Sequence, residues 1–282
     1  MMKKLLIIDG SNLLFQMFFG MPARIVNKAG TAIHGTLGFV GALLKILRMV
    51  EPTHTVVVFD GEHENPRSEI DSDYKANRPD FSQVNREDSP FSQLPDIMNA
   101  LDHLGIRYFE TLDCESDDLI AGFALTYGTD MDIVISSFDS DFFQLITDRV
   151  SVLRYRGDKT LICDSNYLWE KFEIRPDQYA DFKSLTGDSS DNIRGVDKVG
   201  PKTAAALLRQ FGSLEKIIEN YPEITKPSIR TSVMQNINRL KANFTMIKLQ
   251  ADHDLPYSLS QLEWMDSGKT TGQVLRGIGL QP

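Results

Sequence analysis

Lys4-Leu5-Leu6-Ile7-Ile8-Asp9-Gly10-Ser11-Asn12, near the start of the chain, is a short apolar run that ends on a carboxylate. Thr55-Val56-Val57-Val58-Phe59-Asp60 repeats this order, and residues 132–139 lead to Asp139 in a similar way. Apolar runs of this length are typical of parallel strands that are buried on both faces. Residues 36–49 have the spacing of an amphipathic helix between two such strands. The pattern therefore predicts an α/β protein with a mostly parallel sheet.

Composition places the chain among ordinary globular proteins. It has 282 residues, of which 41% are hydrophobic and 24% charged. We find no apolar run long enough for a membrane span or a signal-peptide core, and we therefore expect a cytoplasmic, nucleoid-associated protein. Cys114 and Cys163 fit a reducing compartment and lack the spacing of a zinc site. The five histidines share no spacing, and we assign none of them to catalysis.

A net charge of -9 argues at first against a nucleic-acid partner, because phosphate binding normally depends on Lys and Arg. Nine of the 39 acidic residues, however, are candidate metal ligands. The remaining 30 acids equal the 30 Lys and Arg residues. The distribution of charge, and not its total, therefore decides what the protein can bind.

Changes in pattern divide the chain into three parts. Residues 1–165 carry the strand signals, with a polar, proline-containing excursion at about 62–95 and a predicted hairpin at 152–163. Residues 166–255 have a helical pattern, which we interpret as a second, all-α module. Residues 256–282 show no clear signal and are expected to form a C-terminal tail.

Acidic residues occur at the ends of the predicted strands and at helix starts, and these positions meet at one edge of an α/β sheet. Carboxylates gathered in this way raise each other's pKa values, so divalent cations are needed to keep them ionised. Oxygen ligands select Mg²⁺ or Mn²⁺, and two such ions about 3.5–4 Å apart can hydrolyse a phosphodiester. Any single Asp could instead be a helix cap or a solvated charge. The candidate ligands are Asp9, Asp60, Glu115, Asp117, Asp118, Asp139, Asp141, Asp188 and Asp191.

A second motif covers residues 187–204. Gly195 and Gly200 lie five apart, where backbone amides and a following helix N-terminus could approach a phosphate. Arg194, Lys198 and Lys202 recur at four-residue steps in the same stretch. We interpret it as a sequence-independent DNA grip, with an ordinary helix-turn-helix corner as the alternative.

The polar excursion interleaves cations with aromatic residues, as single-strand binders do. The residues concerned are Arg67, Tyr74, Lys75, Arg78 and Phe81. A solvated loop with scattered charges would have a similar composition.

Over residues 3–255 the chain resembles the 5′-nuclease family, which includes flap endonucleases and the N-terminal nuclease of bacterial family A DNA polymerases. The motifs that carry the resemblance occur in the family's order. They are 8–12, 59–61, 115–118, 139–141, 187–204 and, at the base of the family's helical arch, 74–79. The resemblance implies a PIN-like, Rossmann-related domain joined to a helix-three-turn-helix module. The chain is also expected to be a stand-alone member of the family, with no polymerase module.

The resemblance further implies roles for individual residues. Asp9, Asp60, Glu115, Asp117 and Asp139 would hold one Mg²⁺ or Mn²⁺ ion, and Asp118, Asp141, Asp188 and Asp191 would serve a second ion or its shell. Lys75 and Arg78 would contact the scissile phosphate, with Lys75 as an electrostatic stabiliser. A K⁺ ion would lie at the hairpin around Val196 and Val199. The implied DNA contacts are Arg67, Tyr74, Arg194, Lys198, Gly200, Lys202 and Thr203.

The interpretation that follows is a monomeric, metal-dependent 5′ nuclease, either exonuclease or flap endonuclease, acting on 5′-flap, nicked or gapped duplex DNA. A DNA-binding homologue with little catalysis and a PIN-type ribonuclease are the alternatives. The ribonuclease class generally lacks the 195–204 hairpin, which favours DNA. Whether a flap is threaded through a closed arch or held in an open groove stays open.

Overall fold

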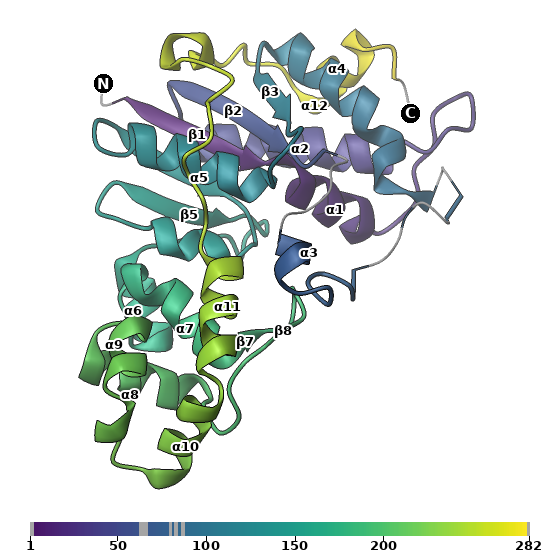
Figure 1. The fold of residues 1–282 in the computed structure, drawn as a ribbon. Coiled ribbons are helices and arrows are strands. Elements are labelled where there is room, and N and C mark those ends of the chain that lie inside the picture. Colours follow the sequence, from purple (N-terminus) through teal and green to yellow (C-terminus); the bar gives the residue numbers. More distant parts are fainter. Residues whose placement is uncertain (1–2, 62–66, 79–80, 82–83, 86–87, 281–282) are drawn as a thin grey trace.

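A six-stranded sheet forms the upper part of the computed structural model, which describes residues 3–61, 67–78, 81, 84–85 and 88–280 (Figure 1). Its order is β3-β2-β1-β4-β5-β6. The parallel strands are β1 (Lys4–Asp9), β2 (His54–Phe59), β3 (Arg107–Glu110), β4 (Asp132–Ser136) and β5 (Val150–Arg154). β6 (Leu161–Cys163) returns antiparallel to β5. The predicted mostly parallel sheet and the hairpin at 152–163 are confirmed.

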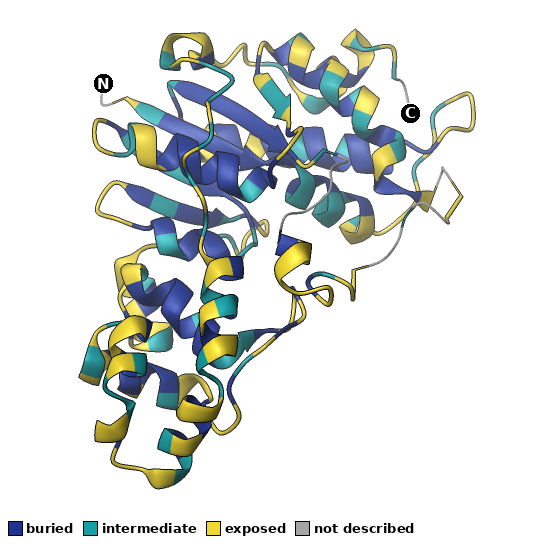
Figure 2. Ribbon diagram, in the orientation of Figure 1, coloured by how far each residue is buried: buried dark blue, intermediate teal, exposed yellow. Residues whose placement is uncertain are grey.

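The apolar runs form central strands because both faces of the sheet are covered (Figure 2). Leu6 and Ile8 pack towards α1 (Gly10–Gly20), α2 (His34–Val50) and α4 (Leu94–Leu104). Leu5 and Ile7 point to the opposite face, where α5 (Ser116–Tyr127) covers the sheet. The helix predicted at 36–49 is therefore α2. Shorter elements between these are α3 (Arg67–Ile70), η3 (Pro90–Gln93) and η4 (Asp141–Leu145).

Residues 165–247 form the helical region below the sheet in Figure 1. Its core is continuous with the α5 face of the sheet. α7 packs against α11 and against η4, so the region is fixed beside the sheet. Its elements are α6 (Ser165–Phe172), η5 (Pro176–Gln178), α7 (Tyr179–Thr186), β7 (Gly187–Asp188), β8 (Ile193–Arg194), α8 (Pro201–Phe211), α9 (Leu214–Glu219), η6 (Tyr221–Glu223), α10 (Pro227–Gln235) and α11 (Ile237–Ile247).

The C-terminal segment differs from the tail expected for 256–282. After α11 the chain returns across the sheet domain to η7 (Leu259–Leu262) and α12 (Thr271–Gly277), next to α4 in Figure 1. Trp264 donates its backbone N–H to Thr53 O and its ring Nε1–H to Leu104 O. Val274 of α12 is fully buried with residues of α2 and α4. A few apolar side chains in a polar segment are enough to dock it, and periodicity does not reveal so short a helix.

Chain order reverses between β1 and β4. β2 and β3 extend the sheet on one side of β1, and β4 and β5 extend it on the other. The carboxyl ends of β1 and β4 therefore flank a topological switch point, which is the usual ligand position in open α/β sheets. No helix among the described residues is long and apolar enough to span a bilayer.

Candidate metal centre

Asp9 occupies the switch point at the end of β1. Its Oδ1 accepts the Asn12 N–H at 2.9 Å and thereby caps α1, and its Oδ2 accepts the Ser137 hydroxyl at 2.7 Å. The same Ser137 Oγ accepts the Asp139 N–H at 2.9 Å. Ser137 thus ties the carboxylate after β1 to the loop after β4.

Asp60 follows β2 and joins the site to α5. Its Oδ1 accepts the Ser116 N–H at 2.8 Å, at the first residue of α5. Its own N–H donates to Ser11 Oγ at 2.9 Å. Close backbone packing supports this position, because a Cβ on Gly61 would lie 1.9 Å from Thr111 O.

The start of α5 contributes Glu115, Asp117 and Asp118, but these acids have different surroundings. Glu115 is buried and pairs with Arg67 and Lys75. Asp118 is buried too, pairs with Arg67 at 2.8 Å and accepts the Gln250 N–H at 2.8 Å. Asp118 therefore ties α5 to α3 and to the segment after α11.

A compact trio lies where η4 meets the β7–β8 hairpin. One carboxylate oxygen from each of Asp141, Asp188 and Asp191 lies within 4.8 Å of the other two. Asp141 Oδ1 is buried and accepts no hydrogen bond among the described residues. The Lys183 ammonium lies 2.5 Å from Asp188 Oδ2 and 4.0 Å from Asp141 Oδ1. A buried carboxylate oxygen with no donor, beside two further carboxylates, is a suitable ligand set for a divalent cation.

Electrostatics link the trio to the acids at the strand ends. Burial, together with repulsion from Asp60 and Asp139, raises the pKa of Asp9 to about 7 despite its hydrogen bonds. Burial, and then repulsion from Asp139, holds the pKa of Asp117 well above its ordinary value. The pKa of Asp139 is likewise raised, by burial and by Asp191.

Asp141 follows the same rule, since burial and the neighbouring Asp139 carboxylate raise its pKa well above the ordinary value. The structure thus brings together acids from separate parts of the sequence, and they oppose one another's ionisation. Divalent cations would reverse this effect, so the residues present fit such ions.

Cations from the polar excursion face the acids. The Lys75 ammonium pairs with Glu115, and Arg78 donates to Asp191 Oδ1 at 2.8 Å. Burial lowers the pKa of Lys75, but the nearby Asp117 and Glu115 carboxylates outweigh it and raise that pKa. Both cations therefore lie where a phosphate beside the acids would meet them.

Arg67 and Tyr74 depart from the expected DNA contacts. Arg67 is 5% exposed and holds Glu115 and Asp118, while Tyr74 is 6% exposed and directs its hydroxyl to Glu115. A buried ring has no free face on which a base can stack. Their place in this structure is to support the acids. The rest of the excursion at 62–66, 79–80, 82–83 and 86–87 lies outside the described residues, and the expected arch or clamp depends on it.

Phe81 of the excursion belongs to an aromatic cluster beside α1. Its ring centroid lies 5.4 Å from that of Phe15 and 6.0 Å from that of Phe91. Phe19 of α1 is in the same cluster and is 59% exposed. The excursion is therefore anchored to the sheet domain by aromatic packing.

The predicted DNA grip has two kinds of glycine. A Cβ on Gly195 would lie 2.3 Å from the Thr186 carbonyl carbon, so Gly195 serves the close packing of the β7–β8 hairpin. Gly200 precedes α8, is exposed, and a Cβ there would meet nothing within 4 Å. Of these two glycines, Gly200 is the one whose backbone is open to solvent.

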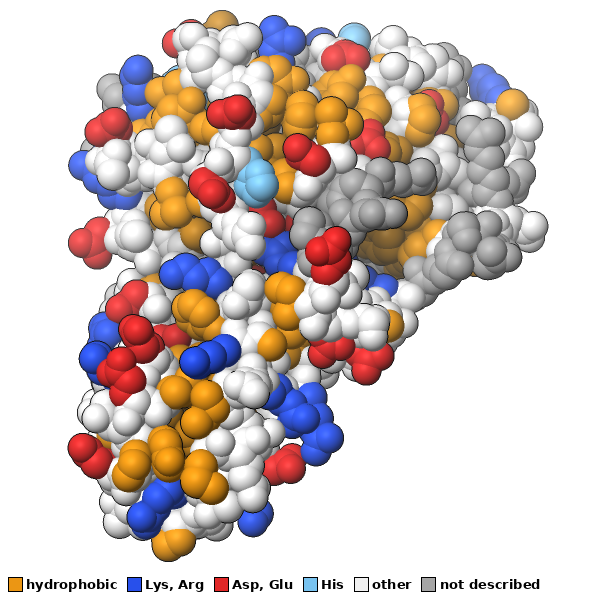
Figure 3. Space-filling model, in the orientation of Figure 1, with side chains coloured by type: hydrophobic (Ala, Val, Ile, Leu, Met, Phe, Trp, Pro, Cys, Tyr) orange, Lys and Arg blue, Asp and Glu red, His pale blue; other side chains and the backbone are white. Residues whose placement is uncertain are grey.

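The basic side chains of this stretch are exposed, whereas its valines are not. Arg194, Lys198 and Lys202 are exposed, and Thr203 is half-buried. Lys and Arg side chains gather on the side of the helical region that carries the loop after β8 (Figures 1 and 3). Val196 and Val199 are buried, and the Val199 N–H donates to Val196 O at 3.1 Å.

Sequence reasoning missed Lys183 and Ser137. Lys183 lies on α7, and its approach to Asp141 and Asp188 depends on how α7 packs against η4. Ser137 directly follows β4, and its position two residues before Asp139 was an available signal. Neither residue type is distinctive, so the fold was needed to identify their contacts.

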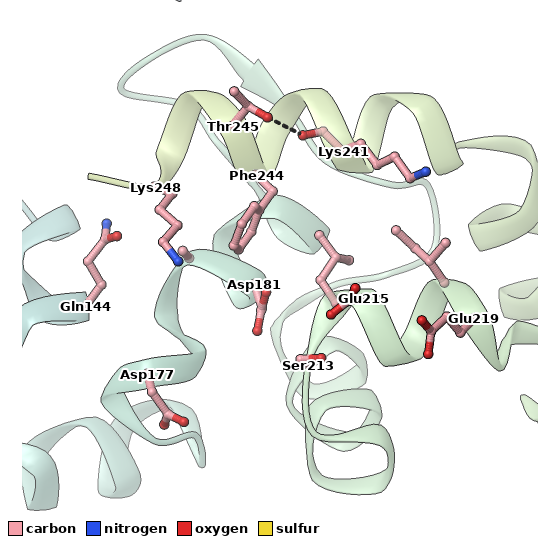
Figure 4. A pocket seen from close by; sticks show the side chains of 13 residues that line it. Gln144, Asp177, Asp181, Ser213, Glu215, Glu219, Lys241, Phe244, Thr245 and Lys248 are labelled. Atoms are coloured by element: carbon pink, nitrogen blue, oxygen red, sulfur yellow. Dashed lines mark hydrogen bonds between the residues drawn. The ribbon is translucent and has the colours of Figure 1, made fainter. Parts of the chain in front are cut away.

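A separate groove of about 880 Å³ lies between α7, α9 and α11 (Figure 4). Phe244, Leu214 and Ile218 contribute apolar lining, and Asp181 lies on one wall. Burial raises the pKa of Asp181 to about 6. None of the candidate metal ligands lines this groove.

Acids gathered at the carboxyl ends of a parallel sheet, with a helical region packed beside them, define an α/β protein with a candidate metal centre. Two family models match the chain: the 5′-3′ exonuclease N-terminal resolvase-like domain over residues 4–173, and the 5′-3′ exonuclease C-terminal SAM fold over residues 174–270. The chain therefore belongs to the 5′-3′ exonuclease family, and it is a nuclease.

Relatives and solved structures agree with this assignment. The chain is 34% identical over 250 residues to the thermostable DNA polymerase I of Thermus aquaticus, covering 88% of this chain and 29% of that protein. It is 35% identical over 267 residues to DNA polymerase I of Streptococcus pneumoniae, covering 92% of this chain and 30% of that protein. The chain thus spans about 30% of the length of these curated relatives.

The fold is shared with viral and Rad2 nucleases. A T5 5′-exonuclease with bound divalent metal ions (zinc) matches with a TM-score of 0.73 and 23% identity, covering 88% of this chain and 90% of that one. The catalytic core of Rad2 in complex with a DNA substrate matches with a TM-score of 0.61 and 14% identity, covering 98% and 93%. At these identities the likeness establishes the fold.

Proposed function

We propose that this protein is a divalent-metal-dependent 5′ nuclease that hydrolyses DNA near the junction of duplex and 5′ single strand. The observation that carries the proposal is the Asp141, Asp188 and Asp191 trio, in which the buried Asp141 Oδ1 accepts no hydrogen bond among the described residues. Further support comes from family membership and from solved relatives described with DNA or metal ions.

The ligand assignment divides the acids into two groups. Asp9, Asp60, Glu115, Asp117 and Asp139 would hold one ion, and the trio would hold the other, with Mg²⁺ or Mn²⁺ preferred by the all-oxygen donor set. Such ions, when bound, activate a water and stabilise the leaving oxygen. Asp118 would support the site through Arg67, which it shares with Glu115.

The chain's own cations act on the substrate. Lys75 and Arg78 would exchange their carboxylate partners for the scissile phosphate and stabilise the charge that develops there. Arg194, Lys198 and Lys202, with the open backbone at Gly200 and Thr203, would hold the duplex by its phosphates. A K⁺ ion at the turn of Val196 and Val199 would add to this contact. In this division, residues 1–165 supply most of the candidate metal ligands, and residues 166–255 supply Asp188, Asp191 and the duplex contacts.

The direct test is cleavage of a 5′-labelled flap duplex with Mg²⁺ or with EDTA, with a matched single-stranded RNA as second substrate. We expect metal-dependent cuts near the flap junction. Binding without cutting would identify an inactive scaffold, and cutting of RNA alone would identify a ribonuclease.

Asp139→Asn is the matched variant for this test. It removes a candidate ligand and keeps an oxygen that can accept the Asp141 N–H. Cleavage should fall by at least about 100-fold, because loss even of an outer partner of a metal ligand costs about 10–100-fold. Duplex affinity in the absence of metal, measured by fluorescence anisotropy, should not decrease. Undiminished turnover would remove Asp139 from the metal site.

A further inference from the structure

Two loops meet beside the acids: the turn at residues 73–78 of the excursion and the loop at 189–192 between β7 and β8. Their main chains join where the Lys75 N–H donates to Asp191 O at 3.0 Å. Asn192 Nδ2 donates to Asp73 O at 2.8 Å, and Asn77 Nδ2 donates to Ser189 O at 3.0 Å. Each loop therefore supplies one amide side chain that bonds to the backbone of the other.

The backbone at this contact has an uncommon conformation on both sides. Lys75 has φ 56° and Asn192 has φ 58°, which places both residues in the left-handed region. Residues other than glycine adopt this region rarely and keep it only where their surroundings hold them there. The crossed amide bonds and the Lys75 N–H bond are the contacts that join the two loops at these residues.

The contact fixes catalytic groups from both loops. On one side are Lys75, paired with Glu115, and Arg78, paired with Asp191. On the other side the loop is bounded by Asp188 and Asp191, which are two members of the carboxylate trio. Asn77 and Asn192 are themselves exposed, and their side-chain bonds go to backbone carbonyls, not to the acids.

We propose that Asn77 and Asn192 are positioning residues that form a reciprocal amide latch, which sets Lys75 and Arg78 against the carboxylates of the trio. This inference rests on the proposed nuclease function. Because residue 192 leads directly through β8 into the 195–204 stretch, the latch also connects the duplex grip to the catalytic cations.

The first test separates the rate of the chemical step from binding. Asn77→Ala and Asn192→Gly each remove one crossed bond, and glycine at 192 adopts the left-handed conformation without strain. We expect the single-turnover cleavage rate on a flap duplex to fall about 3- to 10-fold for each variant, as the loss of one neutral hydrogen bond implies. The duplex Kd should stay within about twofold, because the proposed duplex contacts Arg194, Lys198 and Lys202 are untouched.

Asn220→Ala is the matched control, since Asn220 Nδ2 donates to Lys216 O within its own segment at 2.9 Å. It should cleave at the wild-type rate. Wild-type rates in both latch variants, or a rate loss in Asn220→Ala as large as theirs, would overturn the latch.

A second test asks whether the latch acts through the cations. In a Lys75→Ala, Arg78→Ala background, adding Asn77→Ala or Asn192→Gly should cause no further loss of rate. A purely structural role would lower the residual rate again and would contradict the proposal.

Hydrogen exchange of the Lys75 amide gives a readout that does not need activity. Exchange should quicken in both latch variants and stay unchanged in Asn220→Ala; unchanged exchange in the latch variants would overturn the latch. If the wild type cleaves no flap duplex, the nuclease proposal fails, and the exchange result still decides whether the latch holds Lys75.

Discussion

At the scale of single residues, neighbouring carboxylates of the trio have opposite pKa shifts. Burial alone would raise the pKa of Asp188, but the Lys183 ammonium and the Ser190 hydroxyl and N–H outweigh it and lower that pKa. The pKa of Asp141 is instead well above its ordinary value, because burial and the neighbouring Asp139 carboxylate outweigh the more distant Lys183 ammonium. Lys183 thus acts as an internal counterion for one carboxylate and leaves the other available to a metal ion.

Lys183→Met should destabilise the metal-free protein and increase its response to metal. Breaking a buried ion pair leaves an uncompensated carboxylate and costs about 3 kcal/mol. Mn²⁺ would then replace the lost positive charge, so it should raise the Tm of the variant more than that of the wild type. Urea unfolding and thermal scans with and without Mn²⁺ measure both effects.

Lys216→Met is the control for this prediction, because Lys216 pairs with Glu219 at 2.8 Å on the surface. Exposed pairs contribute little, so stability and metal response should match the wild type. A Lys183→Met protein with wild-type stability would show that Lys183 is no counterion.

At the scale of elements, the sequence predicts where the strands lie better than it predicts contacts between distant segments. The sequence predicts β1 and β2 because a run of apolar residues, buried on both faces, must end where the chain leaves the sheet. The acids that follow are brought together by the parallel arrangement itself. The contacts of Asp118 could not be predicted, because its partners Arg67 and Gln250 come from distant segments. The helix α12 could not be predicted either, because its burial depends on the surfaces of α2 and α4, which are distant in the sequence.

The glycines of the duplex grip should separate stability from DNA binding. Gly195→Ala forces a Cβ against the Thr186 backbone and should lower stability by about 1–3 kcal/mol, as overpacking does. Gly200→Ala meets no atom within 4 Å and should leave the Tm unchanged. Its methyl group would stand where a phosphate approaches the backbone, so duplex affinity should fall several-fold.

Thermal scans and anisotropy titrations at fixed salt measure the two variants side by side. Equal duplex affinity for Gly200→Ala and the wild type would mean that no phosphate approaches this backbone. An unchanged Tm for Gly195→Ala would mean that the hairpin can shift to make room.

At the scale of the whole molecule, the charge balance depends on what occupies the acid site. The chain has a net charge of -9, and its candidate ligands, with Asp9, Asp117, Asp139 and Asp141 among them, have raised pKa values where shifts are resolved, apart from Asp188. Without metal, the fold is therefore opposed by its own site as these groups ionise. The free energy of unfolding must therefore depend on both metal binding and pH.

The direction of this coupling follows from Asp9. Its ordinary pKa is 3.8 and its folded pKa is about 7, so between these values the folded chain binds more protons than the unfolded chain. Stability from this group is present below about pH 4 and is lost as the pH rises through 7.

A divalent ion binds the ionised carboxylates, so the Tm increase caused by Mg²⁺ or Mn²⁺ should be small at pH 5 and should grow through pH 7. Each kcal/mol gained corresponds to roughly 2–4 °C for a chain of this size. Thermal scans at saturating metal and in EDTA, from pH 5 to 8, measure the difference. In Asp9→Asn, the amide oxygen can still accept the Asn12 N–H, while the amide NH2 would donate to Ser137 Oγ. Because this side chain does not ionise, the pH dependence should be flatter. A metal-induced increase of equal size at pH 5 and pH 8 would show that no raised carboxyl pKa is coupled to metal binding.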